Sequence, residues 1–303
     1  MSPTFGDVLL ARVNARESQI VLGLDPDPAA LWPGAAAQTA GDTAHSQGTG
    51  LSGPQQTAAA VLGHCRAVID AAGPACVAVK PQLACFERLG APGWEALEAV
   101  IEHAHERGLL AIADGKRGDI AVSAAAYAQA LFDGLGVDLA TVNPLLGRDA
   151  VEPFLAGARA HGGGVLVLVR TSNPGAADVQ DLQLAEGGTV WERLATLVAE
   201  LGVAGIGAAQ VSDVGAVVGA TAPHHLTRAR ELMPHATLLL PGVGAQGGRV
   251  EDLAAAFATS RAGGLVTASR SIVGAYLANG GDPAHAASAE AERLRDAAWS
   301  LSA

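Results

Sequence analysis

The segment GLLAIADGKRGDI, residues 108–120, joins a short aliphatic run to a cluster of charged residues. An unbroken aliphatic run of this length is typical of a strand that is buried on both faces of a parallel sheet. Asp114 and Lys116 come where the strand should end, and side chains two positions apart on a strand point to the same side. The segment therefore predicts either a salt-bridged strand end or catalytic groups at the mouth of a parallel fold.

The same alternation of aliphatic runs and helical periods extends along the chain. The expected strands cover residues 19–24, 76–80, 109–114, 137–142, 164–169, 214–219, 237–240 and 264–268. The expected helices cover about 57–72, 91–107, 121–135, 149–161, 189–201, 223–233, 250–259 and 271–299, the last broken near Gly280, after an additional helix at about 4–16. Eight strand-then-helix cycles in 303 residues favour an α/β fold of the (β/α)8 TIM-barrel type over a doubly wound sheet.

The composition limits the class of protein. Half of the residues are hydrophobic and 16% are charged, which predicts a large aliphatic core. The net charge of −11 argues against a nucleic-acid partner, which needs a basic surface. No apolar run approaches the roughly 20 residues of a membrane span, and the amino-terminal residues lack a signal-peptide pattern, so no membrane partner is expected. Cys65, Cys76 and Cys85 have no metal-binding spacing, so we expect buried thiols in a cytoplasmic protein.

The expected domain organisation is a single barrel domain over residues 1–303 with a flexible insertion at about 33–56. The insertion is poor in large apolar side chains and rich in Gly, Ser, Thr and Gln, and no chemistry is assigned to it. Residues 172–188 form a long loop after the fifth expected strand, and long barrel loops are usually functional or disordered.

Polar residues gather after the carboxyl ends of the expected strands, where barrel enzymes place their active sites. The opposite strand ends carry plain turns such as GPAC at 73–76. Lys80, which ends the second strand, could join Asp114, Lys116 and Asp119 in an alternating network of acids and bases. Such a network keeps lysines protonated and carboxylates ionised, and a protonated lysine can donate a proton to a carbanion. The alternative is a structural salt-bridge cluster.

The last two strands are followed by features that suit a phosphate group. The loop PGVGAQGG, residues 241–248, offers backbone N–H groups with little side-chain bulk, and Arg270 stands at the start of the last helical segment. Loops after strands seven and eight often bind phosphate in barrels, and arginine can bind it with two hydrogen bonds. The alternative is a glycine-rich turn beside a surface arginine.

The histidines give weaker signals. Four of them lie on expected outer helices and are expected at the surface: His64, His103, His105 and His161. His224 and His225 follow the sixth strand and could line the rim of the site. No group of His, Cys, Asp and Glu has metal-ligand spacing, so no metal site is expected.

The motifs together resemble a known family. DGKRGDI matches the DxKxxDI signature of orotidine 5′-phosphate decarboxylases, and the chain is similar to the longer bacterial branch, the type 2 enzymes. The other matching motifs, in family order, are VKPQLACFERLG, VNPLLG, VRTSNPGA, VVGAT, PGVGAQGG and SRSI. The resemblance implies a (β/α)8 barrel that decarboxylates orotidine 5′-monophosphate to UMP and CO2, the last step of de novo pyrimidine biosynthesis, with no metal or organic cofactor.

The resemblance also implies catalytic roles. Lys116 would protonate C6 of the pyrimidine, Asp114 would face the departing carboxylate, and Lys80 and Asp119 would complete a charged tetrad. Family members are homodimers with shared active sites, so Asp119 and Ser123 would serve the site of the partner subunit. Many relatives carry Thr where this chain has Ser123.

The resemblance further implies a set of substrate-binding residues. Asp25 would bind the ribose, Ser172 the edge of the pyrimidine, and Arg270 the phosphate, with help from backbone amides near Gly244 and Ser269. Gln246 would bridge the base and the phosphate. The full implied set is Asp25, Ile120, Ser123, Ser172, Pro241, Gln246, Ser269 and Arg270.

Two other functions are compatible with parts of the sequence. A magnesium-dependent decarboxylase or aldolase of the same superfamily, acting on a sugar phosphate, would need an acidic metal ligand where this chain has Lys80. A non-catalytic barrel that binds nucleotides would not need lysines and carboxylates placed side by side. Turnover that is insensitive to EDTA excludes the first, and any turnover excludes the second.

Overall fold

The computed structural model describes residues 3–34 and 53–302. Eight parallel strands close into a barrel in which each strand pairs with the next one in the chain and β8 pairs with β1. The strands are β1 (Ile20–Leu24), β2 (Ala78–Pro81), β3 (Leu110–Arg117), β4 (Leu139–Val142), β5 (Gly164–Arg170), β6 (Val214–Val218), β7 (Leu238–Pro241) and β8 (Gly264–Ala268). The predicted (β/α)8 TIM barrel is confirmed, and the doubly wound alternative is excluded.

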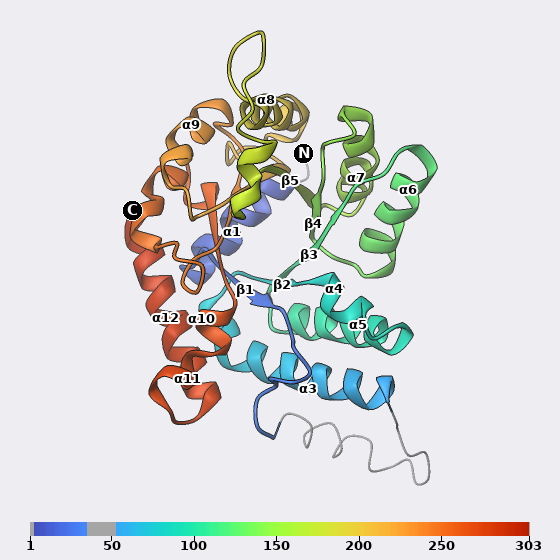
Figure 1. The fold of residues 1–303 in the computed structure, drawn as a ribbon, viewed down its shortest axis with the longest axis vertical. Helices are drawn as coiled ribbons and strands as arrows, with labels where there is room; N and C mark the ends of the chain where they lie inside the picture. The colour runs from blue at the N-terminus through green and yellow to red at the C-terminus, as the bar shows by residue number, and fades with distance from the viewer. Residues whose placement is uncertain (1–2, 35–52, 303) are drawn as a thin grey trace.

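The helices surround the barrel in chain order (Figure 1). The long helices are α1 (Phe5–Arg16), α3 (Pro54–Ala72), α5 (Ala91–Glu106), α6 (Ala121–Gln129), α7 (Arg148–Ala160), α8 (Val190–Gly202), α9 (His224–Leu232) and α12 (Pro283–Leu301). The short helices are α4 (Leu83–Glu87), α10 (Arg270–Val273) and α11 (Ala275–Asn279), and the 3-10 helix η5 (Val250–Phe257) replaces the helix expected between β7 and β8.

Some boundaries differ from the predicted ones for local reasons. The helix expected over 121–135 ends as an α-helix at Gln129 and continues as the π-helical turn η2 (Ala130–Gly134). The helix expected over 271–299 is divided into α10, α11 and α12, and the predicted break at Gly280 is confirmed, because that residue has a φ of 69°, which a glycine adopts readily.

Two apolar cores hold the barrel together. The larger one lies between the outer face of the sheet and the surrounding helices. The smaller one fills the inside of the barrel, where α1 contributes Phe5, Leu9 and Val13. Phe5 lies close to Gly164 at the start of β5, so α1 covers the amino-terminal end of the barrel, and it appears behind the strands in Figure 1. The carboxyl end of the barrel is therefore the open one.

The predicted insertion at about 33–56 lies largely outside the described residues. Its last residues, 54–56, form the first turn of α3, where Pro54 occupies a position that proline tolerates at the start of a helix. The organisation of residues 1–303 as a single domain stays a prediction. Within the described ranges, no helix is both long and apolar enough to cross a membrane.

Two of the four histidines expected at the surface are buried, so that prediction was wrong for His64 and His103. His64 is 4% exposed, and its Nδ1 atom accepts a hydrogen bond of 3.1 Å from the backbone N–H of Trp32. Burial lowers the pKa of His64 to about 4. His103 is 8% exposed, with its Nε2 atom 2.9 Å from Asp70 Oδ1. Each imidazole ring forms a hydrogen bond, which offsets the cost of burying it on the inward face of its helix.

Candidate active site

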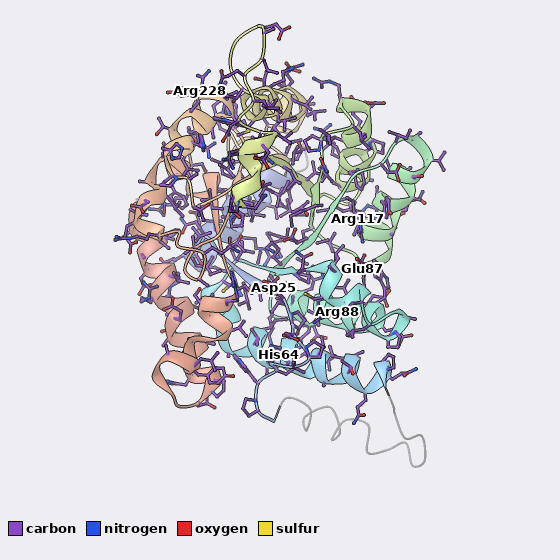
Figure 2. The ribbon with its side chains drawn as sticks, in the orientation of Figure 1. Asp25, His64, Glu87, Arg88, Arg117 and Arg228 are labelled. Carbon is purple, nitrogen blue, oxygen red and sulfur yellow. The ribbon has the colours of Figure 1, made fainter. Side chains whose placement is uncertain are left out.

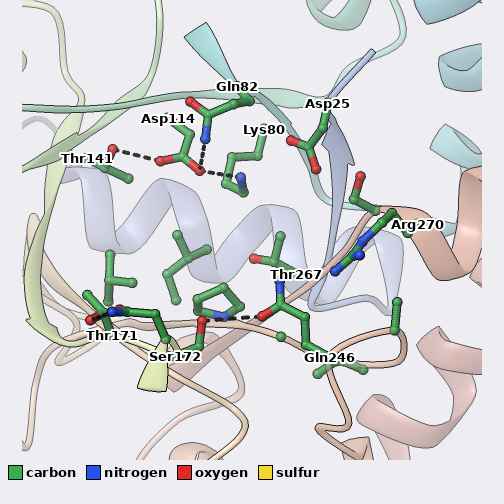
Figure 3. A pocket seen from close by; sticks show the side chains of 18 of the residues that line it. Asp25, Lys80, Gln82, Asp114, Thr141, Thr171, Ser172, Gln246, Thr267 and Arg270 are labelled. Carbon is green, nitrogen blue, oxygen red and sulfur yellow. Dashed lines mark hydrogen bonds and ion pairs between the residues drawn. The ribbon is translucent and has the colours of Figure 1, made fainter. Parts of the chain in front are cut away.

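The open end of the barrel holds a cavity of about 380 Å3. Strand ends and the loops that follow them supply its walls, as Figure 3 shows. The predicted site residues that line it are Asp25, Lys80, Asp114, Lys116, Ser172, Pro241, Gln246, Ser269 and Arg270. Residues from all eight barrel strands or the loops that follow them thus converge on one space, although they are far apart in the sequence.

Asp114 is the centre of the charged cluster in this cavity. Its Oδ2 atom lies 2.5 Å from Lys80 Nζ, and its Oδ1 atom lies 2.6 Å from Lys116 Nζ. Burial alone would raise the pKa of Asp114, but the charges of the two lysines and their hydrogen bonds outweigh it and lower the pKa to about 2. The carboxylate is therefore ionised at neutral pH and lies between two ammonium groups.

Both ammonium groups are held by the carboxylate but differ in exposure. The side chain of Lys80 is 7% exposed, and that of Lys116 is 44% exposed. These are the two lysines of the whole chain, and the other 17 of its 19 lysine and arginine residues are arginines. An ammonium is a compact point charge that can lose a proton, whereas the arginine guanidinium stays protonated.

The end of β3 places Asp114 and Lys116 by an irregularity in the sheet. The register between β3 and β4 shifts between Ala113 and Arg117, and Lys116 has a φ of 47°. A left-handed backbone is uncommon at a residue with a side chain, and such strained conformations cluster at active sites. Asp114 and Lys116 both line the cavity, as predicted, although this bulge interrupts the regular strand period from which the prediction was made.

The wall of the cavity opposite the charged cluster carries the residues that were expected to bind the phosphate and the pyrimidine base. Arg270 opens α10 and is exposed, without an ion-pair partner among residues 3–34 and 53–302. Ser172 Oγ is 3.4 Å from Gln246 Oε1, which connects the loop after β5 to the loop after β7. Gly244 has a φ of 78°, and a Cβ atom there would lie 2.7 Å from Ser271 Cβ. The glycine lets the loop approach the start of α10.

Three predicted residues lie outside this cavity. Asp119 Oδ1 accepts a hydrogen bond of 2.8 Å from the backbone N–H of Ile120 and does not join the charged cluster of its own chain. Ile120 is 57% exposed, and Ser123 is exposed in the first turn of α6. A single chain therefore brings together Lys80, Asp114 and Lys116, and the fourth member of the tetrad stays a prediction.

Arg117, the charge in the middle of the motif, points away from the cavity. Its guanidinium pairs with Glu87 of α4 and lies over the ring of Tyr127 of α6, 5.3 Å from the ring centre. Figure 2 labels Arg117 and Glu87, which lie near each other. The rings of His224 and His225 on α9 lie next to each other, with centres 4.0 Å apart and planes tilted by 46°, and neither lines the cavity.

Five polar residues of the cavity were missed by the sequence reasoning: Gln82, Thr141, Thr171, Asn173 and Thr267. Gln82 follows Lys80 by two positions, so the two-residue period of a strand could have found it. Its Nε2 atom lies 3.4 Å from Asp114 Oδ2. Thr141 and Thr267 lie within strands whose apolar neighbours gave no sign of a polar role.

The fold and the cavity together define a (β/α)8-barrel enzyme, with an ionic catalytic cluster at one side of its open end and an arginine with a glycine-rich loop at the other. A family model described as "Orotidine 5'-phosphate decarboxylase / HUMPS family" matches residues 18–289. The chain belongs to this family.

Individual relatives agree with the family match. The chain is 42% identical over 274 residues to the orotidine 5′-phosphate decarboxylase of Deinococcus radiodurans, covering 90% of each protein. It is 40% identical over 296 residues to the enzyme of that name from an Azoarcus species, covering 97% of each. The structure of Leishmania donovani OMP decarboxylase superposes with a TM-score of 0.70 at 30% identity, over 97% of this chain and 99% of that one. Membership of the longer bacterial branch stays a prediction.

Proposed function

We propose that the cluster around Asp114 carries out the family's reaction, the decarboxylation of orotidine 5′-monophosphate to UMP and CO2 in pyrimidine biosynthesis. The observation that supports it most strongly is the carboxylate held at 2.5 and 2.6 Å between the two lysines of the chain, inside a cavity that also contains Arg270, which has no ion-pair partner within the described ranges. Binding alone would not need this arrangement, because each charge in it must be desolvated.

The reaction needs a fixed positive charge next to C6 of the pyrimidine. When the bond from C6 to the carboxyl group breaks, CO2 leaves and its electron pair stays on C6 as a carbanion with no adjacent group to accept it. Lys116 stabilises the developing charge and then transfers a proton from Nζ to C6, which leaves a neutral amine. Asp114 lies beside the departing carboxylate and repels it, while Lys80 keeps Asp114 ionised and in place.

The other end of the cavity supplies binding energy and orientation. Arg270 binds the phosphate with Ser269 and the backbone of the 241–248 loop, which begins at Pro241. Asp25 accepts hydrogen bonds from the ribose, while Ser172 and Gln246 contact the pyrimidine. Binding energy from the phosphate, which does not react, can be used to hold the base against the charged cluster.

We also propose a homodimer in which Asp119 and Ser123 complete the site of the partner subunit. Both lie outside their own cavity, on a surface with exposed apolar side chains: Ile120, Val122, Leu145 and Leu146, at 57%, 83%, 73% and 52% exposure. The loops that carry them touch, since a Cβ atom at Gly118 would lie 3.1 Å from Asn143 Cβ. Exposed apolar patches of this kind mark protein–protein contacts.

The proposal assigns no metal or organic cofactor to the reaction. Lys80 stands where the magnesium-dependent alternative needs an acidic ligand, and its ammonium group would repel a divalent cation. We also propose a cytoplasmic location, supported by Cys65, Cys76 and Cys85, which all lie in the described ranges and are free thiols.

The role of Lys116 is tested by two substitutions. Lys116→Ala removes the ammonium group, whereas Lys116→Arg keeps a positive charge beside Asp114 but has no proton to give at neutral pH. Both variants should bind UMP and lose decarboxylation by at least about a thousandfold, which is a loss typical of removing a proton donor together with its electrostatic stabilisation. An arginine variant with substantial turnover would show that proton donation by Lys116 is not required.

The shared site is tested by mixing inactive variants. Lys116→Ala and Asp119→Ala should each be inactive alone, and their mixture should regain activity after subunit exchange, because one site of each hybrid dimer has both intact halves. Exchange is followed independently with subunits that carry different affinity tags. If hybrids form and the mixture stays inactive, the shared-site proposal fails.

A further inference from the structure

Thr141 of β4 lies on the cavity wall next to the charged cluster, 1% exposed. Its hydroxyl oxygen is 3.1 Å from Asp114 Oδ1 and 2.9 Å from the backbone nitrogen of Lys116. Figure 3 shows the contact with Asp114 as a dashed line. One hydroxyl group therefore touches both residues to which the reaction chemistry is assigned.

The direction of these two hydrogen bonds follows from the chemistry of a hydroxyl. It has one proton to donate and two lone pairs to accept with. The Lys116 N–H can only donate, so the hydroxyl accepts there. The hydroxyl can donate its proton either to Asp114 Oδ1 at 3.1 Å or to the carbonyl of Ala113 at 3.5 Å. The bond to Asp114 is the stronger one, because it is shorter and its acceptor is ionised.

The backbone bond explains how the bulge at the end of β3 is held. The regular ladder between β3 and β4 is lost between Ala113 and Arg117, so the N–H of Lys116 has no strand partner there. An N–H group that has lost its strand partner needs another acceptor, and the Thr141 hydroxyl provides one at 2.9 Å. It thereby supports the left-handed backbone of Lys116, whose φ is 47°.

Asp114 Oδ1 is a shared acceptor in this network. It accepts from Lys116 Nζ at 2.6 Å and from the Thr141 hydroxyl, while Oδ2 accepts from Lys80 Nζ. The hydroxyl fixes the rotation of the carboxylate plane, because Oδ1 is held from the β4 side and Oδ2 from the β2 side. Without it, Oδ1 is held by the partly exposed Lys116 side chain alone.

We propose that Thr141 is a positioning residue for decarboxylation: through one hydroxyl group it sets the orientation of the Asp114 carboxylate and the backbone from which Lys116 reaches C6. The inference rests on the proposed roles of Asp114 and Lys116. It goes further by assigning a function to a strand residue that need not touch the substrate.

The test compares Thr141→Val, which keeps the shape and removes the hydroxyl, with Thr141→Ser, which keeps the hydroxyl. The valine variant should lose about tenfold to a hundredfold in kcat, the range expected when a hydrogen bond to a charged group is removed. Its affinity for UMP should stay within about threefold of the original, because Arg270 and the phosphate loop are untouched. The serine variant should recover most of kcat.

A matched control separates positioning from stability. Thr237 is also buried, and its hydroxyl donates a 2.9 Å hydrogen bond to the carbonyl of Ala262, outside the cavity. Thr237→Val should lower the melting temperature about as much as Thr141→Val and leave kcat unchanged. If Thr141→Val does not fold, as judged by circular dichroism, Thr141→Ala replaces it.

The outcomes distinguish this inference from the proposed function. A valine variant with kcat within twofold of the original, or a folded serine variant as slow as the valine one, overturns the role of Thr141. If Lys116→Ala is inactive in the same experiment, only this inference has failed. If Lys116→Ala keeps its activity, the roles of the cluster and the inference built on them both fail.

Discussion

Replacing Asp114 by Asn removes the carboxylate between the ammonium groups of Lys80 and Lys116 and keeps the size of the side chain. The pKa of Asp114 falls from 3.8 to about 2 on folding, despite burial. At about 1.4 kcal/mol per pKa unit, the ionised carboxylate stabilises the fold by about 2 kcal/mol relative to a neutral side chain. The variant should therefore be about 2 kcal/mol less stable than the original protein at pH 7.

The pH dependence of this difference follows from the direction of the shift. Because the folded pKa lies below the unfolded value of 3.8, the contribution is fully present above about pH 5 and is lost as the pH falls through about 2. Urea unfolding followed by circular dichroism at pH 7, 5 and 3 measures it. The difference between the two proteins should be the same at pH 7 and 5, and roughly half as large at pH 3.

Asp25→Asn is the matched control, because Asp25 lines the same cavity, is exposed and forms no ion pair within the described ranges. It should change the free energy of unfolding by less than about 1 kcal/mol. An Asp114→Asn variant that is as stable as the original at pH 7, or more stable, would contradict the reasoning. The desolvation penalty of the charged groups would then outweigh their mutual attraction.

Three further predictions address other parts of the molecule. Arg270→Ala should lower kcat/KM by about tenfold to a hundredfold by removing the hydrogen bonds to the phosphate, and steady-state kinetics checks this. The pKa of His64 is about 4 in the folded protein and 6.5 in the unfolded chain, so about 3 kcal/mol of stability that is present above pH 6.5 should be lost as the pH falls to 4. In urea unfolding at several pH values, His64→Asn should remove this pH dependence. An amine-specific reagent should label Lys116, whose side chain is 44% exposed, and spare Lys80 at 7%, and bound UMP should protect Lys116, as peptide mass spectrometry would show.

Much of the fold could be predicted from the sequence because the strands are buried on both faces. A short aliphatic run such as residues 164–169, with glycine before it and a charged residue after it, fits a buried strand better than other structures. The observed strand β5 covers Gly164–Arg170. The helix ends were less certain. Nothing in residues 130–134 marks a π-helical turn, and η5 is a 3-10 helix although residues 250–257 have an ordinary helical period.

The charged part of the site was also predictable, because acids and bases at strand ends stand out against aliphatic neighbours. Thr141 and Thr267 were missed because a threonine within an aliphatic strand is an ordinary β-branched residue, and only the closed barrel shows which way it points. His64 was misplaced for a related reason. Its helical period does not reveal that Trp32, 32 residues earlier in the chain, provides a backbone N–H for its ring.

The central claim is that this chain decarboxylates orotidine 5′-monophosphate with its own side chains. The most direct measurement follows the ultraviolet absorbance of orotidine 5′-monophosphate as the purified protein acts on it, in buffer with EDTA and no added metal. The account predicts loss of substrate with formation of equal amounts of UMP and CO2, at a rate unaffected by EDTA. A protein that binds UMP but turns over no substrate, or that requires added Mg2+, would contradict it.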